Sequence, residues 1–326
     1  MPPRVTAVRP LRAIEGGRIT IEGSDLPLDG PRLPAVHVGG VPARVVQASS
    51  SSLTVIVPAG LDAGSTPIRI EGVSGETLFV DIAAQFATGL HQVDNPVFDR
   101  DGNLYVTYSG TRGQQVPVSI FKVRPNGTRE TFSSGIVNAT SMAMDSQGRL
   151  YVSSRFEGTV YRVAQDGTFE TFATDLGIAC GLAFDREGIL YVGDRSGTLF
   201  RVNAEGKAQP LATLPSSVAA FHLAIAPDGF IWVTAPTLST YDPIYKVSPT
   251  GTVSTVDVRF GRPQGIAFDL HGTPYVVEAL AGASGLYRVL GNSAELVLAG
   301  ANLIGVAFDA FGSTVVCSNE TAYRLK

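Results

Sequence analysis

The stretch "GLAFDREGILYVGDRSGTLFRV" (181–202) has the pattern of three short strands joined by two tight turns. The first apolar run ends at Asp185, and Gly188 follows three residues later. Aspartate side chains accept hydrogen bonds from turn amides, and glycine tolerates the backbone angles of tight turns. The stretch therefore predicts three strands of one antiparallel unit, with "AQPLATL" (208–214) as its fourth, outer strand.

The same unit recurs along the chain. Six copies of its first half lie 40 to 46 residues apart: "PVFDRDGNLYV" (96–106), "MAMDSQGRLYV" (142–152), "LAFDREGILYV" (182–192), "LAIAPDGFIWV" (223–233), "IAFDLHGTPYV" (266–276) and "VAFDAFGSTVV" (306–316). A period near 40 residues with several short strands is typical of a β-propeller, so we predict six blades. The last copy lacks its fourth strand. Because "QFATGLHQVDNPVFD" (85–99) parallels "TFATDLGIACGLAFD" (171–185), residues near 80–88 are predicted to supply that strand and close the ring.

The first eighty residues do not fit the repeat. Short alternating runs separated by turns predict a small β-sandwich; they are "GGRITIEGSDL" (16–26), "AVHVGGVPARVVQAS" (35–49), "SSLTVIVPAG" (51–60) and "TPIRIEG" (66–72). We expect an all-β protein of two domains, a sandwich over residues 1–79 and a six-bladed propeller over residues 80–326.

Both parts resemble known families. The Gly-Gly before "ITIEG", the "VHVGG" followed by "A-x-V-V" and the "VPAG" resemble the TIG/IPT immunoglobulin-like family over most of residues 3–80. That resemblance implies a spacer or interaction module. Residues 80–326 resemble the NHL and senescence-marker-protein/gluconolactonase group of six-bladed propellers. This second resemblance implies the architecture, which serves enzymes and binding scaffolds alike.

Composition excludes several classes of function. The net charge is −4 and no basic run is visible, which argues against nucleic-acid binding. No apolar run approaches the length of a membrane span. Two cysteines make neither a disulfide framework nor a zinc pattern. The start "MPPRVTAVRP" lacks the apolar core of a secretion signal, as expected of a cytoplasmic protein or of a secreted one whose signal has been removed. We expect a monomer.

Functional residues are expected where the copies differ. A residue type that recurs in every copy, such as the turn aspartate or the basic residue before the third-strand valine, serves the blade. At one end of the central channel, loops enter the inner strands and leave the second strands. The polar residues that break the repeat there are Asn95, Asn138, His222, Arg262, Gln264 and Asn302 at the entrances, and Arg155, Asp194, Arg195, Glu278, Asn319 and Glu320 at the exits.

Each candidate has a structural and a functional interpretation. His222 would contact a ligand or metal, or would be a hydrogen-bonded histidine that fills the axis. Glu278 would be catalytic, or would form a salt bridge. Asp194 would belong to a ligand site, or to a surface pair or turn. Arg155 and Arg195 occupy similar places in adjacent blades, and together they would hold a carboxylate or phosphate if they are not simply solvated.

The enzymatic resemblances imply a metal. Gluconolactonase-like enzymes hold one divalent ion with Glu, two Asn and Asp from different inner strands, and use it to polarise a lactone carbonyl. In this sequence Asn95 stands where Glu is expected, with Asp94 beside it, and no Asp occurs at the later entrances. The candidate ligands for Ca, Mg or Zn are therefore Asn95, Asn138, His222 and Glu278, with His222 and Glu278 as catalytic residues.

Two further hypotheses are a lyase and a binding scaffold. "RPQGIAFDLHGTPYVVEA" (262–279) resembles the repeat of streptogramin lyases, which implies a metal held by His and Glu, but no His closely follows Glu278. We favour a scaffold whose polar channel mouth, including Asn95, Asn138 and Gln264, binds a small molecule, carbohydrate or protein. This hypothesis needs no catalytic constellation. The alternatives are a metal-dependent lactonase or esterase and a streptogramin-lyase-like enzyme.

Overall fold

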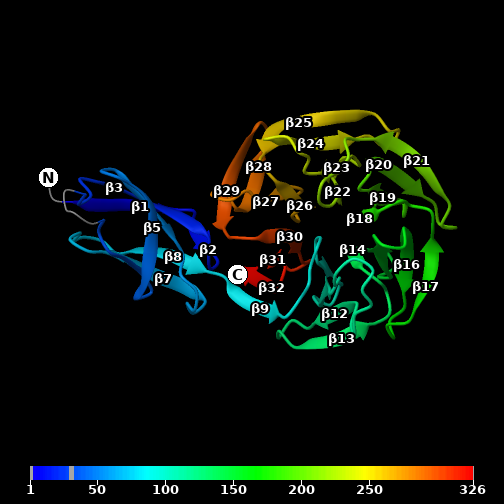
Figure 1. The fold of residues 1–326 in the computed structure, drawn as a ribbon, viewed down its shortest axis with the longest axis horizontal. Helices are drawn as coiled ribbons and strands as arrows, with labels where there is room; N and C mark the ends of the chain where they lie inside the picture. The colour runs from blue at the N-terminus through cyan, green and yellow to red at the C-terminus, as the bar shows by residue number, and fades with distance from the viewer. Residues whose placement is uncertain (1–2, 29–32, 326) are drawn as a thin grey trace.

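A computed structural model of the protein describes residues 3–28 and 33–325. Within these ranges the chain forms strands, turns and loops and contains no helix. A small sandwich, drawn in blue in Figure 1, stands beside a ring of sheets arranged around a central axis. The all-β class and the propeller arrangement predicted from the sequence are confirmed.

The sandwich consists of two sheets that share the long strand β5. In one sheet, the order is β1-β3-β6-β5; in the other, β4, β7 and β8 pair in that order. The strands are β1 (Arg4–Arg9), β3 (Arg18–Ser24), β4 (Val36–Val38), β5 (Val41–Ser49), β6 (Ser52–Ile56), β7 (Gly64–Ile70) and β8 (Leu78–Ile82). Gly39 and Gly40, both at positive φ, make the tight turn from β4 to β5. Alternate residues such as Ile19, Ile21 and Leu53 form the buried core.

Five blades of the ring are separate four-stranded sheets, and each of the first four is a simple meander with its first strand innermost. The strands of these four blades are β10 (Val97–Phe98), β11 (Leu104–Thr107), β12 (Ile120–Val123) and β13 (Arg129–Ser133); β14 (Ala139–Met144), β15 (Leu150–Ser154), β16 (Thr159–Val163) and β17 (Phe169–Ala173); β18 (Ala179–Phe184), β19 (Leu190–Asp194), β20 (Thr198–Val202) and β21 (Ala208–Thr213); and β22 (His222–Ile225), β23 (Ile231–Thr234), β24 (Asp242–Val247) and β25 (Val253–Phe260).

The fifth separate blade contains both ends of the propeller. Strands β30 (Leu303–Phe308), β31 (Thr314–Ser318) and β32 (Thr321–Leu325) come from the last repeat, and β9 (Ala84–Thr88) adds to β32 from before the first. In Figure 1 this is where the red C-terminal strands meet the cyan segment. The prediction that residues near 80–88 close the ring is confirmed, with β9 as the strand that does so.

The prediction of six blades is corrected: the structure has five blades that are separate four-stranded sheets. Strands β26 (Pro263–Phe268), β27 (Pro274–Glu278), β28 (Gly285–Leu290) and β29 (Ser293–Ala299) pair as a meander, but they are one end of a twelve-stranded sheet. The cause is β2 (Arg12–Ala13), which runs parallel to β29 at Ala299 and parallel to β8 at Ile82. Because the outer edge of β29 carries free backbone groups, pairing with β2 satisfies them and joins sandwich to ring.

The turn aspartate and the basic third-strand residue, which recur along the chain, have structural roles within the blades, as predicted. Asp145 Oδ1 accepts hydrogen bonds from the backbone N–H groups of Gln147 (2.9 Å) and Arg149 (3.0 Å). The equivalent aspartates of four other repeats make the same turn contacts, whereas the fourth repeat has Ala226 at this place. The basic residue of the third strand pairs or stacks across strands. Lys122, for example, lies 3.7 Å from Asp99 and over the ring of Tyr105.

Candidate functional site

Three polar side chains meet across the channel. Asp94 lies just before β10, and His222 begins β22, on the opposite side of the ring. The distance from His222 Nδ1 to Asp94 Oδ1 is 2.5 Å. On the other side of the imidazole, His222 Nε2 lies 3.3 Å from Oε1 of Gln264. All three residues are buried. Since the contact spans the axis, these side chains close the channel at this level.

The imidazole of His222 is held from both sides. Its Nδ1–H donates to the Asp94 carboxylate, and the ring is completely buried, with 0% of its surface exposed. The second carboxylate oxygen of Asp94, Oδ2, is buried without a hydrogen-bond partner among the described residues. The backbone of Gln264 is held in turn, because its main-chain carbonyl accepts from the hydroxyl of Thr234. His222 is therefore positioned from both sides but is not open to solvent.

Asn95 binds backbone of two other repeats. Its Nδ2 donates to the carbonyl of Ile266 (2.8 Å), and its Oδ1 accepts from the N–H of Val306 (3.0 Å). A side chain at Gly265 would overlap Asn95 Oδ1. Asn95 thus joins the innermost strands β10, β26 and β30 where they converge on the axis.

Asn138 organises the long loop after β11. Its Nδ2 donates to the carbonyls of Ser109 (2.6 Å) and Thr111 (2.8 Å), and its Oδ1 accepts from the N–H of Gly113 (2.6 Å). The backbone of Asn138 is in the left-handed region, with φ of 50°, which asparagine tolerates better than most residues. The loop over residues 109–113 is therefore anchored on the entrance of the next blade.

Glu278 and Asp194 occupy equivalent places at the ends of β27 and β19. Glu278 accepts three backbone hydrogen bonds, from Gly261 (2.6 Å), Arg262 (2.8 Å) and Leu280 (2.7 Å). Asp194 accepts from Ile178 (2.8 Å) and Ser196 (3.1 Å). Each carboxylate holds together the entrance and exit loops of its own blade.

The predicted metal ligands do not fit a common ion in this arrangement. The oxygens of Asn95, Asn138 and Glu278 already accept backbone N–H groups, whereas a hard cation needs free oxygen donors. Among residues 3–28 and 33–325, no three His, Cys, Asp or Glu side chains are grouped to hold a metal. The metal and the catalytic roles of His222 and Glu278 stay predictions.

Three arginines gather at the end of the channel where His222 lies. Arg155 and Arg195 follow β15 and β19, and both side chains are half-buried. Arg112 comes from the loop after β11 and is exposed. No carboxylate in the described part of the chain forms an ion pair with any of the three. Arg155 and Arg195 were predicted either to hold an anion together or to be solvated. The charges of Arg195 and Arg112 act on Arg155, and the joint role of Arg155 and Arg195 stays a prediction.

The positive charges act on one another and on the groups below them. The pKa of Arg155 is lowered, chiefly by burial and further by the guanidinium groups of Arg195 and Arg112. Burial raises the pKa of the Cys180 thiol to about 12, and the charges of Asp94, Arg155 and Arg195 also act on it. Cys180 is thus within electrostatic reach of Asp94, Arg155 and Arg195.

Arg112 and His91 were not among the residues predicted from the sequence. The loop that carries Arg112 packs against the next blade, since a methyl group at Gly113 would touch the ring of Phe156 at 3.0 Å. Phe156 directly follows Arg155, so this packing brings Arg112 near it. The unusual length of the loop was the only signal for Arg112. No sequence signal pointed to His91, because it lies in the segment between β9 and β10, before the first repeat.

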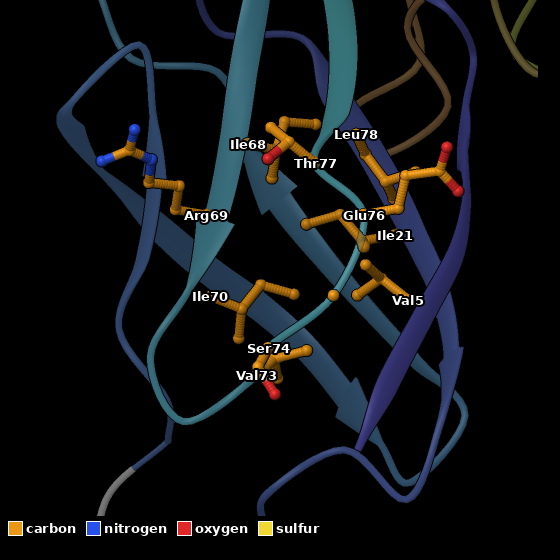
Figure 2. A pocket seen from close by; sticks show the side chains of 11 residues that line it. Val5, Ile21, Ile68, Arg69, Ile70, Val73, Ser74, Glu76, Thr77 and Leu78 are labelled. Atoms are coloured by element: carbon orange, nitrogen blue, oxygen red, sulfur yellow. The ribbon is translucent and has the colours of Figure 1, made fainter. Parts of the chain in front are cut away.

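Two cavities lie away from the arginines. Beyond the Asp94–His222 layer the channel widens into a cavity of about 380 Å³, lined by the inner strands. A second cavity, of about 280 Å³, lies within the sandwich. Figure 2 shows Val5, Ile21, Ile68 and Ile70 pointing into it from β1, β3 and β7. Neither holds a cluster of titratable side chains.

Comparison with known proteins assigns a family to the N-terminal part of the chain. Residues 3–85 match the family described as the IPT/TIG domain. No curated protein sequence matches the chain. None of the described segments forms a helix that is long and apolar enough to cross a membrane.

Solved structures share the fold at low identity. An auxiliary nutrient binding protein from Bacteroides thetaiotaomicron is 15% identical, with a TM-score of 0.58 over 100% of this chain and 98% of its own. A gluconolactonase from Xanthomonas campestris is 14% identical, with a TM-score of 0.59 over 90% and 97%. A virginiamycin B lyase from Staphylococcus aureus is 12% identical, with a TM-score of 0.52 over 72% and 95%. At such identities the likeness concerns the fold alone.

Proposed function

We propose that the protein is a binding scaffold and that its ligand is a small molecule with a carboxylate or phosphate group, held by Arg155 and Arg195 at the channel mouth. The observation that carries this proposal is the gathering of Arg112, Arg155 and Arg195 from three successive blades without an ion-pair partner among the described residues. Guanidinium groups bind carboxylate and phosphate through paired N–H donors.

Charge repulsion supports the same conclusion. Two half-buried guanidinium groups close together raise the free energy of the folded protein, and the lowered pKa of Arg155 is one sign of it. A bound anion would remove this cost and release ordered water. Perturbed charged groups gathered at one end of a propeller channel are also common at functional sites. The nutrient-binding name of one structural neighbour agrees with a binding role.

The test is titration with anions. Inorganic phosphate and gluconate are titrated into the protein by calorimetry, at low ionic strength because salt screens exposed charges. We expect binding that weakens by about tenfold in Arg155→Gln and in Arg195→Gln, the effect of losing one charge-assisted hydrogen-bonded pair. Arg186→Gln, an exposed arginine in the turn at the other end of β18, is the matched control. Without ligand, Arg155→Gln should also raise the melting temperature. The proposal fails if neither anion binds, or if both variants bind as the wild type does.

Metal analysis separates this scaffold from the hydrolase and lyase alternatives. The protein is purified without chelator or histidine tag, and its metal content is measured by mass spectrometry. A stoichiometric divalent ion together with lactone or ester turnover would favour a metal-dependent enzyme. Binding of anions without metal and without turnover supports the scaffold.

A further inference from the structure

A polar cleft lies between the sandwich and the last blade. Its volume is about 710 Å³, and it is lined by the sandwich at Glu15 and Ile56–Ala59 and by the propeller at Asn302 and Ser318–Thr321. Glu15 and Glu320 contribute two carboxylates, and none of the described residues that line the cleft is Lys or Arg. The cleft therefore carries negative charge, and domain interfaces are frequent places for ligand sites.

The backbone brings this cleft next to the channel mouth. Leu90 N–H donates to the carbonyl of Glu320 (3.1 Å), and Gln92 N–H donates to that of Asn319 (2.9 Å). Between them, His91 bridges to the first blade, because its carbonyl accepts from the N–H of Ser109 (3.1 Å). His91 thus lies between the turn that carries Glu320 and the loop that carries Arg112.

Charges of opposite sign act on His91. The pKa of His91 is lowered, chiefly by burial and also by Arg155, while Glu320 acts in the opposite direction. Arg155 and Glu320 are therefore both within electrostatic reach of one imidazole. Glu320 is exposed and forms no ion pair with the described residues. Glu15, deeper in the cleft, accepts a hydrogen bond from the hydroxyl of Tyr323 (3.2 Å).

We propose that the ligand is a zwitterion, whose anionic group binds Arg155 and Arg195 and whose ammonium group reaches Glu320 at the mouth of the cleft. The inference rests on the proposed function, to which it adds the second charge of the ligand. A purely anionic ligand would leave Glu320 unpaired and would be repelled by it. A molecule with both charges is complementary to both sides of the site, and such complementarity selects among ligands.

A series of ω-amino acids tests the proposal. Unbranched amino acids with the ammonium at one end and the carboxylate at the other, of two to eight carbons, are titrated into the full chain. Each is compared with the alkanoate of the same length. At one chain length we expect the amino acid to bind about tenfold more tightly than its alkanoate, as expected for one hydrogen-bonded charge pair. The ratio of the two affinities is the readout, and the best length reports the span between the charges.

Two variants locate the effect. Glu320→Gln should bring the affinity ratio at the best length close to one. Glu205→Gln, an exposed glutamate in the turn between β20 and β21, should leave the ratio as in the wild type. The zwitterion proposal is overturned if the ammonium group gives no advantage at any length, or if the advantage survives Glu320→Gln. If the alkanoates also fail to bind and Arg155→Gln changes nothing, the proposed function itself is wrong.

Discussion

At the scale of single residues, buried polar groups in this protein bind the backbone more often than one another. Glu278, Asn95 and Asn138 each accept or donate across two or more chain segments, and none of the three forms an ion pair with the described residues. A propeller needs such residues because its loops enter and leave every blade at the same end, where backbone groups lack strand partners. The same residue types would serve a metal or a substrate, so their type alone does not reveal their role.

Replacement of Glu278 distinguishes a structural role of this residue from a catalytic one. Glu278→Ala leaves three N–H groups without their acceptor, so we expect the free energy of unfolding to fall by about 2–4 kcal/mol in a denaturant titration. Glu205→Ala serves as an exposed control. A Glu278→Ala protein that is as stable as the wild type but has lost a catalytic activity would instead support the catalytic prediction.

The sequence predicted local contacts well and distant ones poorly. The turn aspartates were assigned correctly because Asp145 and its counterparts bind N–H groups two and four residues away. His222 was singled out, yet its partner Asp94 lies 128 residues away on the opposite side of the ring. A pairing of that kind depends on how the blades close, which no local pattern encodes. His91 and Arg112 lie outside the repeat, so comparison of the copies could not find them.

At the scale of elements, the short strand β2 has the largest effect for its length. It contains only Arg12 and Ala13, and no alternation of apolar residues announces it. Its register with Ala299 nevertheless makes all four strands of the fifth repeat part of the sandwich sheet. The repeats and the ring-closing strand were predictable because they recur; β2 was not, because it occurs once and its pairing is created by the docking of the two domains.

Gly17 permits this docking. A methyl group on Gly17 would overlap the carbonyl oxygen of Ala299, the same oxygen that accepts the hydrogen bond of Ile14. We expect Gly17→Ala to lower the free energy of unfolding by about 2 kcal/mol, since a backbone clash is relieved only by moving one domain. Gly291→Ala is a comparison variant, because Gly291 has positive φ and no neighbour within 4 Å, so that alanine there costs only backbone strain, about 1 kcal/mol. A Gly17→Ala protein as stable as the wild type would show that the clash is absent in solution.

At the scale of the whole molecule, the sandwich and the fifth repeat of the propeller form one continuous hydrogen-bonded sheet. Backbone bonds cross the junction on both sides of β2, from Asp81 to Leu11 (2.8 Å) and from Ile14 to Ala299 (2.9 Å). The cleft at Glu15 and Glu320 keeps its width only if this junction is stiff. We therefore expect the domain arrangement to be an integral part of the proposed ligand site.

Small-angle scattering tests this rigidity. The distance distribution of the full chain should agree with a single arrangement of the two domains, and Gly17→Ala should broaden it. The affinity advantage of the best ω-amino acid should decrease in the same variant, whereas alkanoate binding depends on the arginines alone. A broad distribution already in the wild type would contradict a fixed junction.

The pairing of β9 with β32 also determines when the propeller can complete its folding. Synthesis proceeds from the N-terminus, and domains begin to fold as they emerge. β9 is made before any blade, yet its partner β32 is made after every other strand of the ring. Until then β9 has no strand partner, and the nascent ring is an open arc whose first and last blades cannot meet. The sandwich can be complete early, whereas the arginine cluster and the cleft beside it are assembled together only when the circle is finished.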